Sequence, residues 1–208
     1  MALPSENRRW AGLVAVTAAV ILFTVFGVFY IDQPVLTAVH ALPGTFRVYT
    51  GIVSQLGRAE PYLIPALVLF LFFQFVRRNQ RYANQALFFM AALTVAGVAN
   101  WVCKFGLGRY RPGEWFEHGL YGFKFLGAKA AYWSMPSGHT NTVAAAVAAL
   151  WLLFPRYRVA YIVLLLAVAV DRVLCQAHYP TDVVAGAYLG MVSAVFVHAG
   201  FRRRGCEL

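Results

Sequence analysis

The sequence predicts an all-α protein that crosses a membrane with six helices, built as one integral-membrane domain over residues 1–208. The composition is the first observation: 61% of the residues are hydrophobic and 12% are charged, against about 45–50% and about 25% in soluble domains. Six apolar runs separated by short polar segments are the second observation. The third is that the basic residues cluster beside these runs, as residues that flank membrane helices do. Short interfacial helices are expected between the spans.

The first apolar run extends from about Trp10 to Ile31. It is long enough to cross a bilayer, since about 20 apolar residues are needed. A cleaved signal peptide is the competing interpretation, but the run is long for one and no small-x-small cleavage site follows closely. We therefore expect a retained first span.

Residues 32–60 are mixed in character, and their apolar side chains recur at helical spacing after a helix start at Asp32. This pattern predicts one or two short helices lying in the membrane interface. The second span is expected at about 61–76, where it stops at Arg77 and Arg78.

The remaining four spans are expected at about 86–103, 139–154, 159–170 and 181–201. Gly186 and Gly190 give the last of them a Gly-x-x-x-Gly spacing, which lets neighbouring helices approach closely. We expect this spacing to serve packing within the bundle rather than a dimer. The polar interval 106–135 is rich in aromatic residues, which is typical of the membrane–water boundary.

The basic residues also predict the orientation of the chain. Ten of the 18 Lys and Arg residues fall on one face: Arg8, Arg9, Arg77, Arg78, Arg81, Arg156, Arg158, Arg202, Arg203 and Arg204. Because basic residues favour the cytoplasmic side, both termini are expected in the cytoplasm and the protein in the inner membrane of the cell. With six spans, the extracytoplasmic face receives the ends of spans three and five and the starts of spans four and six. Dispersed basic clusters of this kind argue against a nucleic-acid partner.

The stretch Ser-Met-Pro-Ser-Gly-His-Thr at 134–140 leads directly into the fourth apolar run. A turn that opens into a helix leaves its first N–H groups without intrahelical partners, and with the positive end of the helix dipole these groups form an anion site. His139 lies at the edge of that site. Taken alone, the stretch is equally consistent with a capped membrane helix that carries an incidental histidine.

Two further segments strengthen the first interpretation. Lys104 and Arg111 lie upstream, and Arg172, His178 and Asp182 lie downstream. Three permanent cations, two imidazoles and one carboxylate suit phosphoryl transfer, in which the protein neutralises phosphate oxygens, offers a nucleophile and protonates a leaving oxygen. The three cysteines have no metal-ligand spacing and no acidic cluster resembles a magnesium site, so neither a metal nor a cofactor is expected.

Together, Lys104-x6-Arg111-Pro112, Pro136-Ser137-Gly138-His139 and Arg172-x5-His178-x3-Asp182 resemble the three signature segments of the type 2 phosphatidic acid phosphatase family, which shares its site with the vanadium haloperoxidases. The segments lie within residues 104–182 and occur in the order that the family has. The resemblance implies a six-helix membrane phosphatase that acts on lipid phosphates or diphosphates, without a metal, through a phosphohistidine intermediate.

The resemblance also implies a role for each matching residue. His178 would be the nucleophile, Asp182 the carboxylate that orients it, and His139 the acid that protonates the leaving oxygen and then helps to activate water. The phosphate-binding groups would be Lys104, Arg111, Ser137, the backbone N–H of Gly138 and Arg172.

One position departs from the family pattern, since Asp171 stands where the family usually has serine before the arginine. A carboxylate facing a bound phosphate would repel it, so we expect Asp171 to turn away from the site or to pair with Arg109 or Arg172. For Arg109 itself, support of the site and a solvated place in the loop are equally consistent with the sequence.

The expected partners are the lipid bilayer and a membrane lipid with a phosphate headgroup. Undecaprenyl diphosphate, phosphatidylglycerophosphate, phosphatidic acid and lipid A phosphates all fit. A lipid phosphotransferase would use the same residues, and a lipid-phosphate transporter or scramblase is a third alternative that would need more polar residues through the bilayer depth. The sequence leaves the oligomeric state open.

Overall fold

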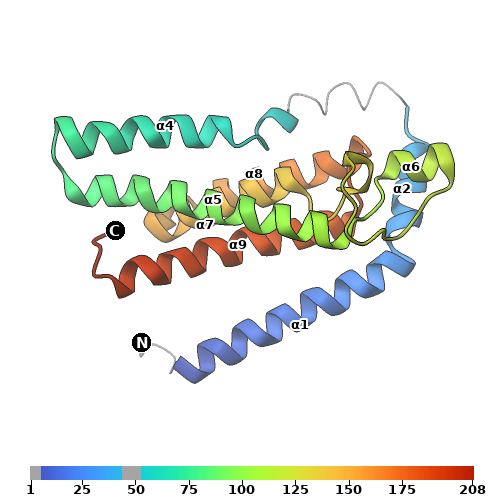
Figure 1. Cartoon of the computed structure of the whole chain (residues 1–208), viewed down its shortest axis with the longest axis horizontal. Helices are drawn as coiled ribbons and strands as arrows, with labels where there is room; N and C mark the ends of the chain where they lie inside the picture. The colour runs from blue at the N-terminus through green and yellow to red at the C-terminus, as the bar shows by residue number, and fades with distance from the viewer. Residues whose placement is uncertain (1–5, 44–52) are drawn as a thin grey trace.

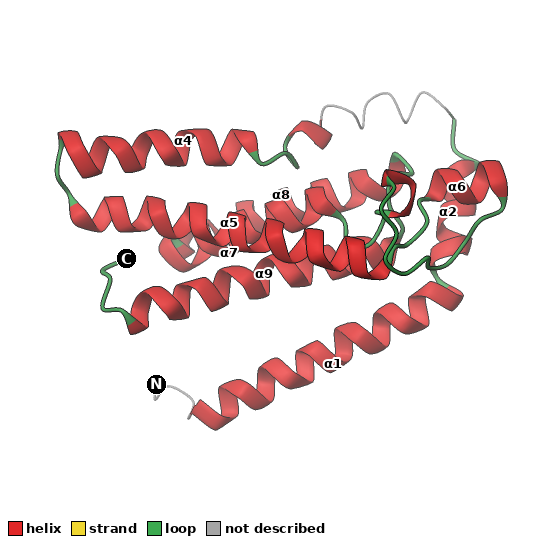
Figure 2. Ribbon diagram, in the orientation of Figure 1, coloured by secondary structure: helices red, strands yellow, loops and turns green. Residues whose placement is uncertain are grey.

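The computed structural model describes residues 6–43 and 53–208, and in this part of the chain the structure is a bundle of helices (Figures 1 and 2). Its β-structure is limited to a bridge between Arg109 and Phe123. The all-α prediction is therefore confirmed. The helical prediction for residues 32–60 falls partly on residues 44–52, which lie outside the described ranges.

Every predicted span coincides with a helix. The longer helices are α1 (Glu6–Tyr30), α4 (Glu60–Leu71, continued by the π-helical turn Phe72–Val76), α5 (Gln80–Leu107), α7 (Gly138–Leu153), α8 (Arg158–Leu174) and α9 (Pro180–Arg203). The shorter ones are α2 (Asp32–His40), α6 (Pro112–His118) and the 3-10 turns Ala130–Tyr132 and Pro155–Tyr157. Helix α5 exceeds the predicted 86–103 at both ends, so Lys104 lies in its last turn instead of following it.

Within the described ranges, three helices are long and apolar enough to cross a membrane: Ala11–Tyr30, Gln80–Leu107 and Pro180–Arg203. Helix α7 is apolar but has 16 residues, which at about 1.5 Å per residue is shorter than the roughly 30 Å hydrocarbon core. The helix formed by Glu60–Val76 is likewise apolar and short. The structure thus supports a membrane protein with three long candidate spans.

Small side chains bring the central helices together. Helix α7 packs against α5, α8 and α9, and α5 also packs against α4 and α9. The buried core between α5, α7 and α9 contains Ala92, Ala96, Ala145, Ala146, Ala149 and Ala194. Because alanine lets helix backbones approach closely, van der Waals packing can hold the bundle together without a hydrophobic driving force between helices.

Gly186 and Gly190 of α9 allow a close approach to α7. A methyl group at Gly186 would lie 2.5 Å from the carbonyl oxygen of Ser137, and one at Gly190 would overlap the carbonyl oxygen of Asn141. Both contacts are with the first turns of α7. The expectation that this glycine pair serves packing within the bundle is confirmed.

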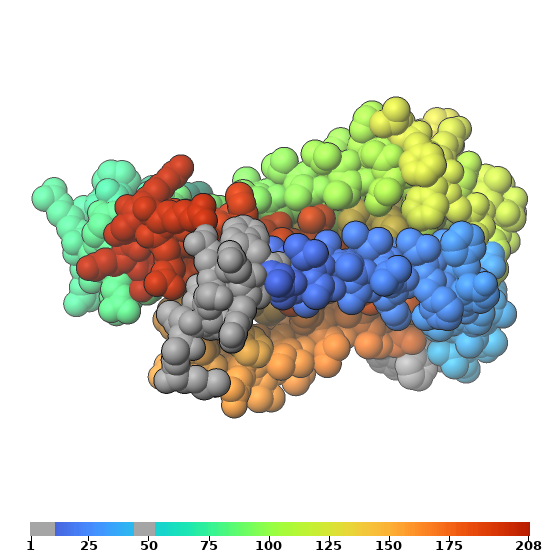
Figure 3. Space-filling view, turned by 90° about the horizontal axis from the view of Figure 1, so that it is seen from below, coloured from blue at the N-terminus to red at the C-terminus, as the bar shows by residue number. Residues whose placement is uncertain are grey.

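All the motif-bearing segments gather at one end of the bundle. Figure 1 shows α2, α6, the start of α9 and the loops that follow α5 together at this end, whereas the start of α1 and the end of α9 lie at the other. In the space-filling view α1 lies along the surface of the bundle, and α2 reaches the polar end (Figure 3). Contacts between α1 and α9 hold this arrangement.

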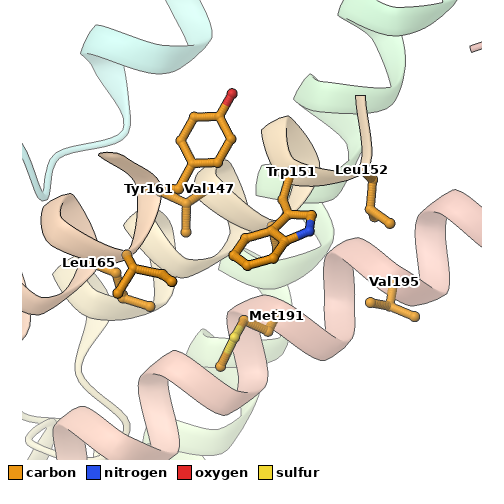
Figure 4. Close-up of a pocket in the computed structure, with 9 residues that line it drawn as sticks. Val147, Trp151, Leu152, Tyr161, Leu165, Met191 and Val195 are labelled. Atoms are coloured by element: carbon orange, nitrogen blue, oxygen red, sulfur yellow. The ribbon is translucent and has the colours of Figure 1, made fainter. Parts of the chain in front are cut away.

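Away from the polar end, the faces of the helices are apolar. A groove of about 240 Å³ between α7, α8 and α9 is lined by side chains that include Val147, Trp151, Leu165 and Met191. Figure 4 shows Trp151 in the space between Tyr161 and Met191. Apolar side chains on an outer surface are compatible with surrounding lipid, whereas charged side chains there would be costly. The charged residues accordingly lie toward the ends of the bundle.

The glycine contact yields a test of how tightly the bundle is packed. Gly190→Ala should lower the stability by about 1–3 kcal/mol, because the added methyl group must push α7 away from α9. Gly200→Ala is the matched control on the same helix, since a methyl group there meets nothing within 4 Å. The measurement is the thermal unfolding midpoint of the purified protein in detergent. Equal midpoints for the two variants would contradict the close approach.

Candidate active site

The end of α5 positions the first cations of the site. Lys104 lies in the last turn, and Gly108 ends the helix with a left-handed backbone conformation at φ 58°. A side chain at Gly108 would overlap the carbonyl oxygen of Lys124, so both the conformation and the space require glycine. The chain then turns to present Arg109 and Arg111.

Arg109 is completely buried between two carboxylates. Its Nη1 donates to Asp182 Oδ1 at 2.6 Å and to Thr181 Oγ1 at 2.7 Å, and its Nη2 donates to Asp32 Oδ2 at 2.6 Å. Its guanidinium carbon lies 4.2 Å from the ring centre of Tyr179. Burial alone would lower the pKa of Arg109, but Asp182 and Asp32 outweigh burial and raise the pKa above its ordinary value. Arg109 is therefore a permanent buried cation with both partners inside the protein.

Asp182 lies in the first turn of α9, and both of its carboxylate oxygens accept hydrogen bonds. Its Oδ2 accepts hydrogen bonds from Ser134 Oγ at 2.6 Å and from the backbone N–H of Tyr179 at 2.9 Å. The same oxygen lies 3.6 Å from Nδ1 of His178. This separation is too long for a hydrogen bond, but it identifies Nδ1 as the ring nitrogen beside the carboxylate. Nε2 is then the nitrogen left for reaction.

His178 is a buried, neutral imidazole. Its backbone N–H donates to the carbonyl oxygen of Arg172 at 3.2 Å, which ties the loop before α9 to the end of α8. Burial lowers the pKa of His178 to about 4, with help from Lys104 and Arg111, while Asp182 opposes the shift. At neutral pH the ring is unprotonated, as a nucleophile must be.

The turn at 134–140 is fixed to both neighbouring segments. The backbone N–H of Ser137 donates to the carbonyl oxygen of Asp182 at 2.9 Å, and Ser137 Oγ lies 3.1 Å from Thr140 Oγ1. Gly138 begins α7, and a methyl group there would lie 3.8 Å from Cε of Lys104. The start of α7 therefore lies beside Lys104 of the first segment.

His139 is half-buried in the first turn of α7, and its ring packs against Gly57, where a methyl group would lie 2.5 Å from Cδ2. It lies within electrostatic range of Arg172, Asp171, Lys104 and Arg111. Lys104 and Arg111 are thus near both His139 and His178.

The remaining cations keep donors free for an anion. Lys104 Nζ donates to the carbonyl oxygen of Trp133 at 2.6 Å, and Arg111 Nε donates to that of Ala130 at 3.0 Å. Among the residues that the structure describes, neither has a carboxylate within 4.0 Å. Burial lowers the pKa of Arg111, and the nearby charge of Arg172 lowers it further, although Asp182 opposes both. Lys104, Arg111 and Arg172 are near enough to repel one another, so an anion that binds among them would relieve the repulsion.

Asp171 takes one of the alternatives that the sequence left open. Its Oδ2 accepts from Nε of Arg172 at 3.0 Å and from Nη2 at 2.6 Å, and Ser54 Oγ donates to the same oxygen at 2.9 Å. It therefore pairs with Arg172 and not with Arg109. One carboxylate oxygen occupies one edge of the guanidinium and leaves Nη1 for another partner.

The structure brings together all eight residues singled out from the sequence, namely Lys104, Arg111, Ser137, Gly138, His139, Arg172, His178 and Asp182. Sequence reasoning missed Asp32, Ser134 and Thr181, which hold Arg109 and Asp182, and Gly57, which packs against His139. For Asp32 the sequence offers one signal, a carboxylate directly after the first span, and that signal also fits a simple helix start.

These features can be compared with known proteins. A profile of the PAP2 superfamily matches residues 85–206. Lipid A 1-phosphatases from Rhizobium etli and Rhizobium johnstonii are 40% and 39% identical over 103 and 110 residues, which is 50% and 53% of this chain and 44% and 45% of theirs. The chain thus spans about half the length of these curated relatives.

Two crystal structures share the fold. The structure of Aquifex aeolicus LpxE has a TM-score of 0.61 at 18% identity, covering 81% of this chain and 94% of that one. A PAP2-type phosphatidylglycerolphosphate phosphatase from Bacillus subtilis has a TM-score of 0.61 at 17% identity, covering 92% and 96%. Since the family profile matches more than half of the residues, the chain belongs to the PAP2 superfamily.

Proposed function

We propose that this protein is an integral-membrane lipid phosphatase that hydrolyses a lipid phosphate or diphosphate through a phosphohistidine intermediate. The observation that carries the proposal is a buried neutral His178, which has Asp182 on one side and, on the other, Lys104 and Arg111, neither of which pairs with a carboxylate within the described ranges. Paired with Asp182, the ring can bear the positive charge that nucleophilic attack creates. Two relatives named lipid A 1-phosphatase support the reaction class.

The reaction begins when Nε2 of His178 attacks the phosphorus atom and the bond to the leaving oxygen breaks. His139 gives its proton to that oxygen as it departs. The neutral His139 then takes a proton from a water molecule, whose oxygen attacks the phosphohistidine. The bond between Nε2 and phosphorus breaks, phosphate leaves, and His178 returns to the neutral state with His139 protonated again.

Lys104, Arg111 and Arg172 neutralise the phosphate oxygens during both steps, together with Ser137 and the N–H of Gly138. Because these donors are fixed before substrate arrives, they stabilise the developing charge without reorganisation. The groups that bind the phosphate oxygens are side chains and a backbone N–H, so the mechanism requires no metal or cofactor. Among the described residues no cluster of three or more His, Cys, Asp or Glu side chains is placed to hold a metal ion.

The proposed membrane arrangement has six spans, with both termini in the cytoplasm and the site on the extracytoplasmic face. It is supported by the location of the site at the end of the bundle opposite the start of α1 and the end of α9 (Figure 1). The terminal basic residues Arg202, Arg203 and Arg204 lie at the end where the cytoplasm is expected. The lipid tail remains in the bilayer while its headgroup enters the cationic pocket.

The favoured substrate class is a lipid phosphate monoester such as lipid A 1-phosphate, because two relatives that are 40% and 39% identical over about half of this chain carry the name lipid A 1-phosphatase. Phosphatidylglycerophosphate, phosphatidic acid and undecaprenyl diphosphate are the competitors. A phosphotransferase would share every step up to the phosphohistidine, and only the acceptor would differ.

The first test is an assay of the purified protein in detergent against these four lipids, with and without an acceptor lipid. We expect phosphate release that survives EDTA, because side chains carry the positive charge, and inhibition by orthovanadate, which can adopt a five-coordinate geometry in the same pocket. Activity that disappears with EDTA and returns with magnesium would contradict the mechanism. Transfer to the acceptor in place of release would identify a phosphotransferase.

The leaving-group role of His139 predicts a difference between substrates. An alkoxide leaving group resembles hydroxide, whose parent pKa is about 15.7, and needs a proton donor. A phosphate leaving from a diphosphate has a pKa near about 6 and needs little help. His139→Ala should therefore reduce kcat/KM for monoesters by about 10²–10⁴-fold and for diphosphates by much less. Equal losses would instead assign His139 to phosphate binding, whereas His178→Ala should abolish both reactions.

The pairing of Asp171 with Arg172 predicts that the family's usual serine is not equivalent here. Asp171→Ser removes the acceptor that fixes two guanidinium donors, so KM should rise about 10-fold or more as Arg172 loses its orientation. Asp171→Asn is the matched comparison, because an amide oxygen can still accept from one edge of Arg172. Kinetics on the substrate found in the assay decide the point, and unchanged KM in Asp171→Ser would show that Arg172 is oriented by other contacts.

A further inference from the structure

Asp32 joins the start of α2 to the catalytic end of α9. It is completely buried, although it lies in a segment that none of the three motifs includes. Its Oδ1 accepts the backbone N–H of Thr181 at 3.1 Å, and its Oδ2 accepts Thr181 Oγ1 at 2.5 Å and Arg109 Nη2 at 2.6 Å. Every oxygen of this carboxylate is therefore engaged with residues that contact or adjoin Asp182.

The first consequence is geometric. Thr181 lies in the first turn of α9, where backbone N–H groups have no intrahelical partner. Asp32 supplies that partner from a distant segment and so acts as a cap for α9 from outside the helix. Because Asp182 is the next residue, this contact fixes the turn that carries the carboxylate beside His178.

The second consequence concerns charge. Arg109 contacts Asp182 through Nη1 and Asp32 through Nη2, both at 2.6 Å. A lone Arg109–Asp182 pair would be neutral, and little negative charge would remain for His178. With Asp32 included, the three groups carry a net charge of −1. The other groups that contact them are uncharged. Ser134, Thr181 and the N–H of Tyr179 donate to the carboxylates, and the hydroxyl oxygen of Tyr121 accepts from Arg109.

His178 faces this negative cluster on one side and the cations Lys104 and Arg111 on the other. Attack on phosphorus makes the imidazole ring positive, which the cations oppose and a negative cluster stabilises. In a buried site such a charge acts with little screening. The net charge of the cluster therefore bears on the rate of the chemical step more than on phosphate binding.

We propose that Asp32 is a positioning residue of the active site, which holds Arg109 and the start of α9 so that Asp182 presents a net negative charge to His178. The proposal rests on the phosphohistidine mechanism given above. Asp32 touches no reacting atom, and it acts through Arg109 and Thr181. Burial raises the pKa of Asp32, and Arg109 and Thr181 oppose that rise only in part. The charged state follows from the geometry, since both carboxylate oxygens accept hydrogen bonds and one of them lies 2.6 Å from the guanidinium of Arg109.

The test compares kcat with the inhibition constant for inorganic phosphate. Asp32→Asn keeps the size of the side chain and makes the cluster neutral, so kcat should fall about 10- to 100-fold. The phosphate-binding cations are untouched and one nearby negative charge is lost, so the inhibition constant for phosphate should stay the same or decrease. If the substitution instead distorted the site, kcat would fall and the inhibition constant for phosphate would rise. Glu114→Gln removes an acidic residue of α6 outside the site and is the control for a change in overall charge.

A double variant separates charge from structure. Asp32→Asn with Arg109→Gln returns the cluster to a net charge of −1 through Asp182 alone, so its kcat should exceed that of Asp32→Asn. A purely structural role predicts that the double variant is worse than the single one, and that result would overturn the proposal. Loss of folding in both variants would assign Asp32 to the stability of the fold and overturn it as well.

The design also distinguishes this proposal from the proposed function. If the unaltered protein releases no phosphate from any lipid tested, the phosphatase assignment fails. If it releases phosphate and Asp32→Asn has the same kcat as the unaltered protein, only the role of Asp32 fails. Folding of each variant is checked by gel filtration and by its thermal unfolding midpoint in detergent.

Discussion

The ion cluster of Arg109 with Asp32 and Asp182 is the interaction on which the catalytic end of this protein depends. It joins three segments that are far apart in the sequence: the start of α2, the loop after α5 and the first turn of α9. Burying a lone guanidinium or carboxylate would cost several kcal/mol, so each member requires the others to be in place. The same contacts settle where Asp182 sits and therefore where His178 lies.

Pairing also decides which cations are left for the substrate. Arg109 has two internal carboxylates and is fully buried, whereas Lys104 and Arg111 donate to backbone carbonyl oxygens and, within the described ranges, have no carboxylate within 4.0 Å. Arg172 is intermediate, because Asp171 engages one edge of its guanidinium and leaves another donor free. The basic residues thus differ in role. Arg109 stabilises the fold around Asp182, whereas Lys104, Arg111 and Arg172 have donors available to an anion.

The bundle positions this polar end by close packing of small residues. Alanines of α5, α7 and α9 form the core, and Gly186 and Gly190 let α9 touch the first turns of α7. Since those turns contain Ser137, Gly138 and His139, helix packing sets the distance between the second and third motifs. Lipid-facing surfaces contribute apolar side chains instead, as the groove around Trp151 shows (Figure 4).

The sequence by itself determined the all-α class and the approximate helix positions, because apolar runs are local signals. It indicated the eight residues that meet at one end through three short motifs and their resemblance to a known family. It also predicted that Asp171 would pair with an arginine or turn away, but not which of these. Only the tertiary structure decided that Arg109 is buried and that Asp32, Ser134 and Thr181 complete the site. The physical reason is that a run of residues encodes which segments are apolar, whereas the partner of a buried charge is set by how distant helices pack.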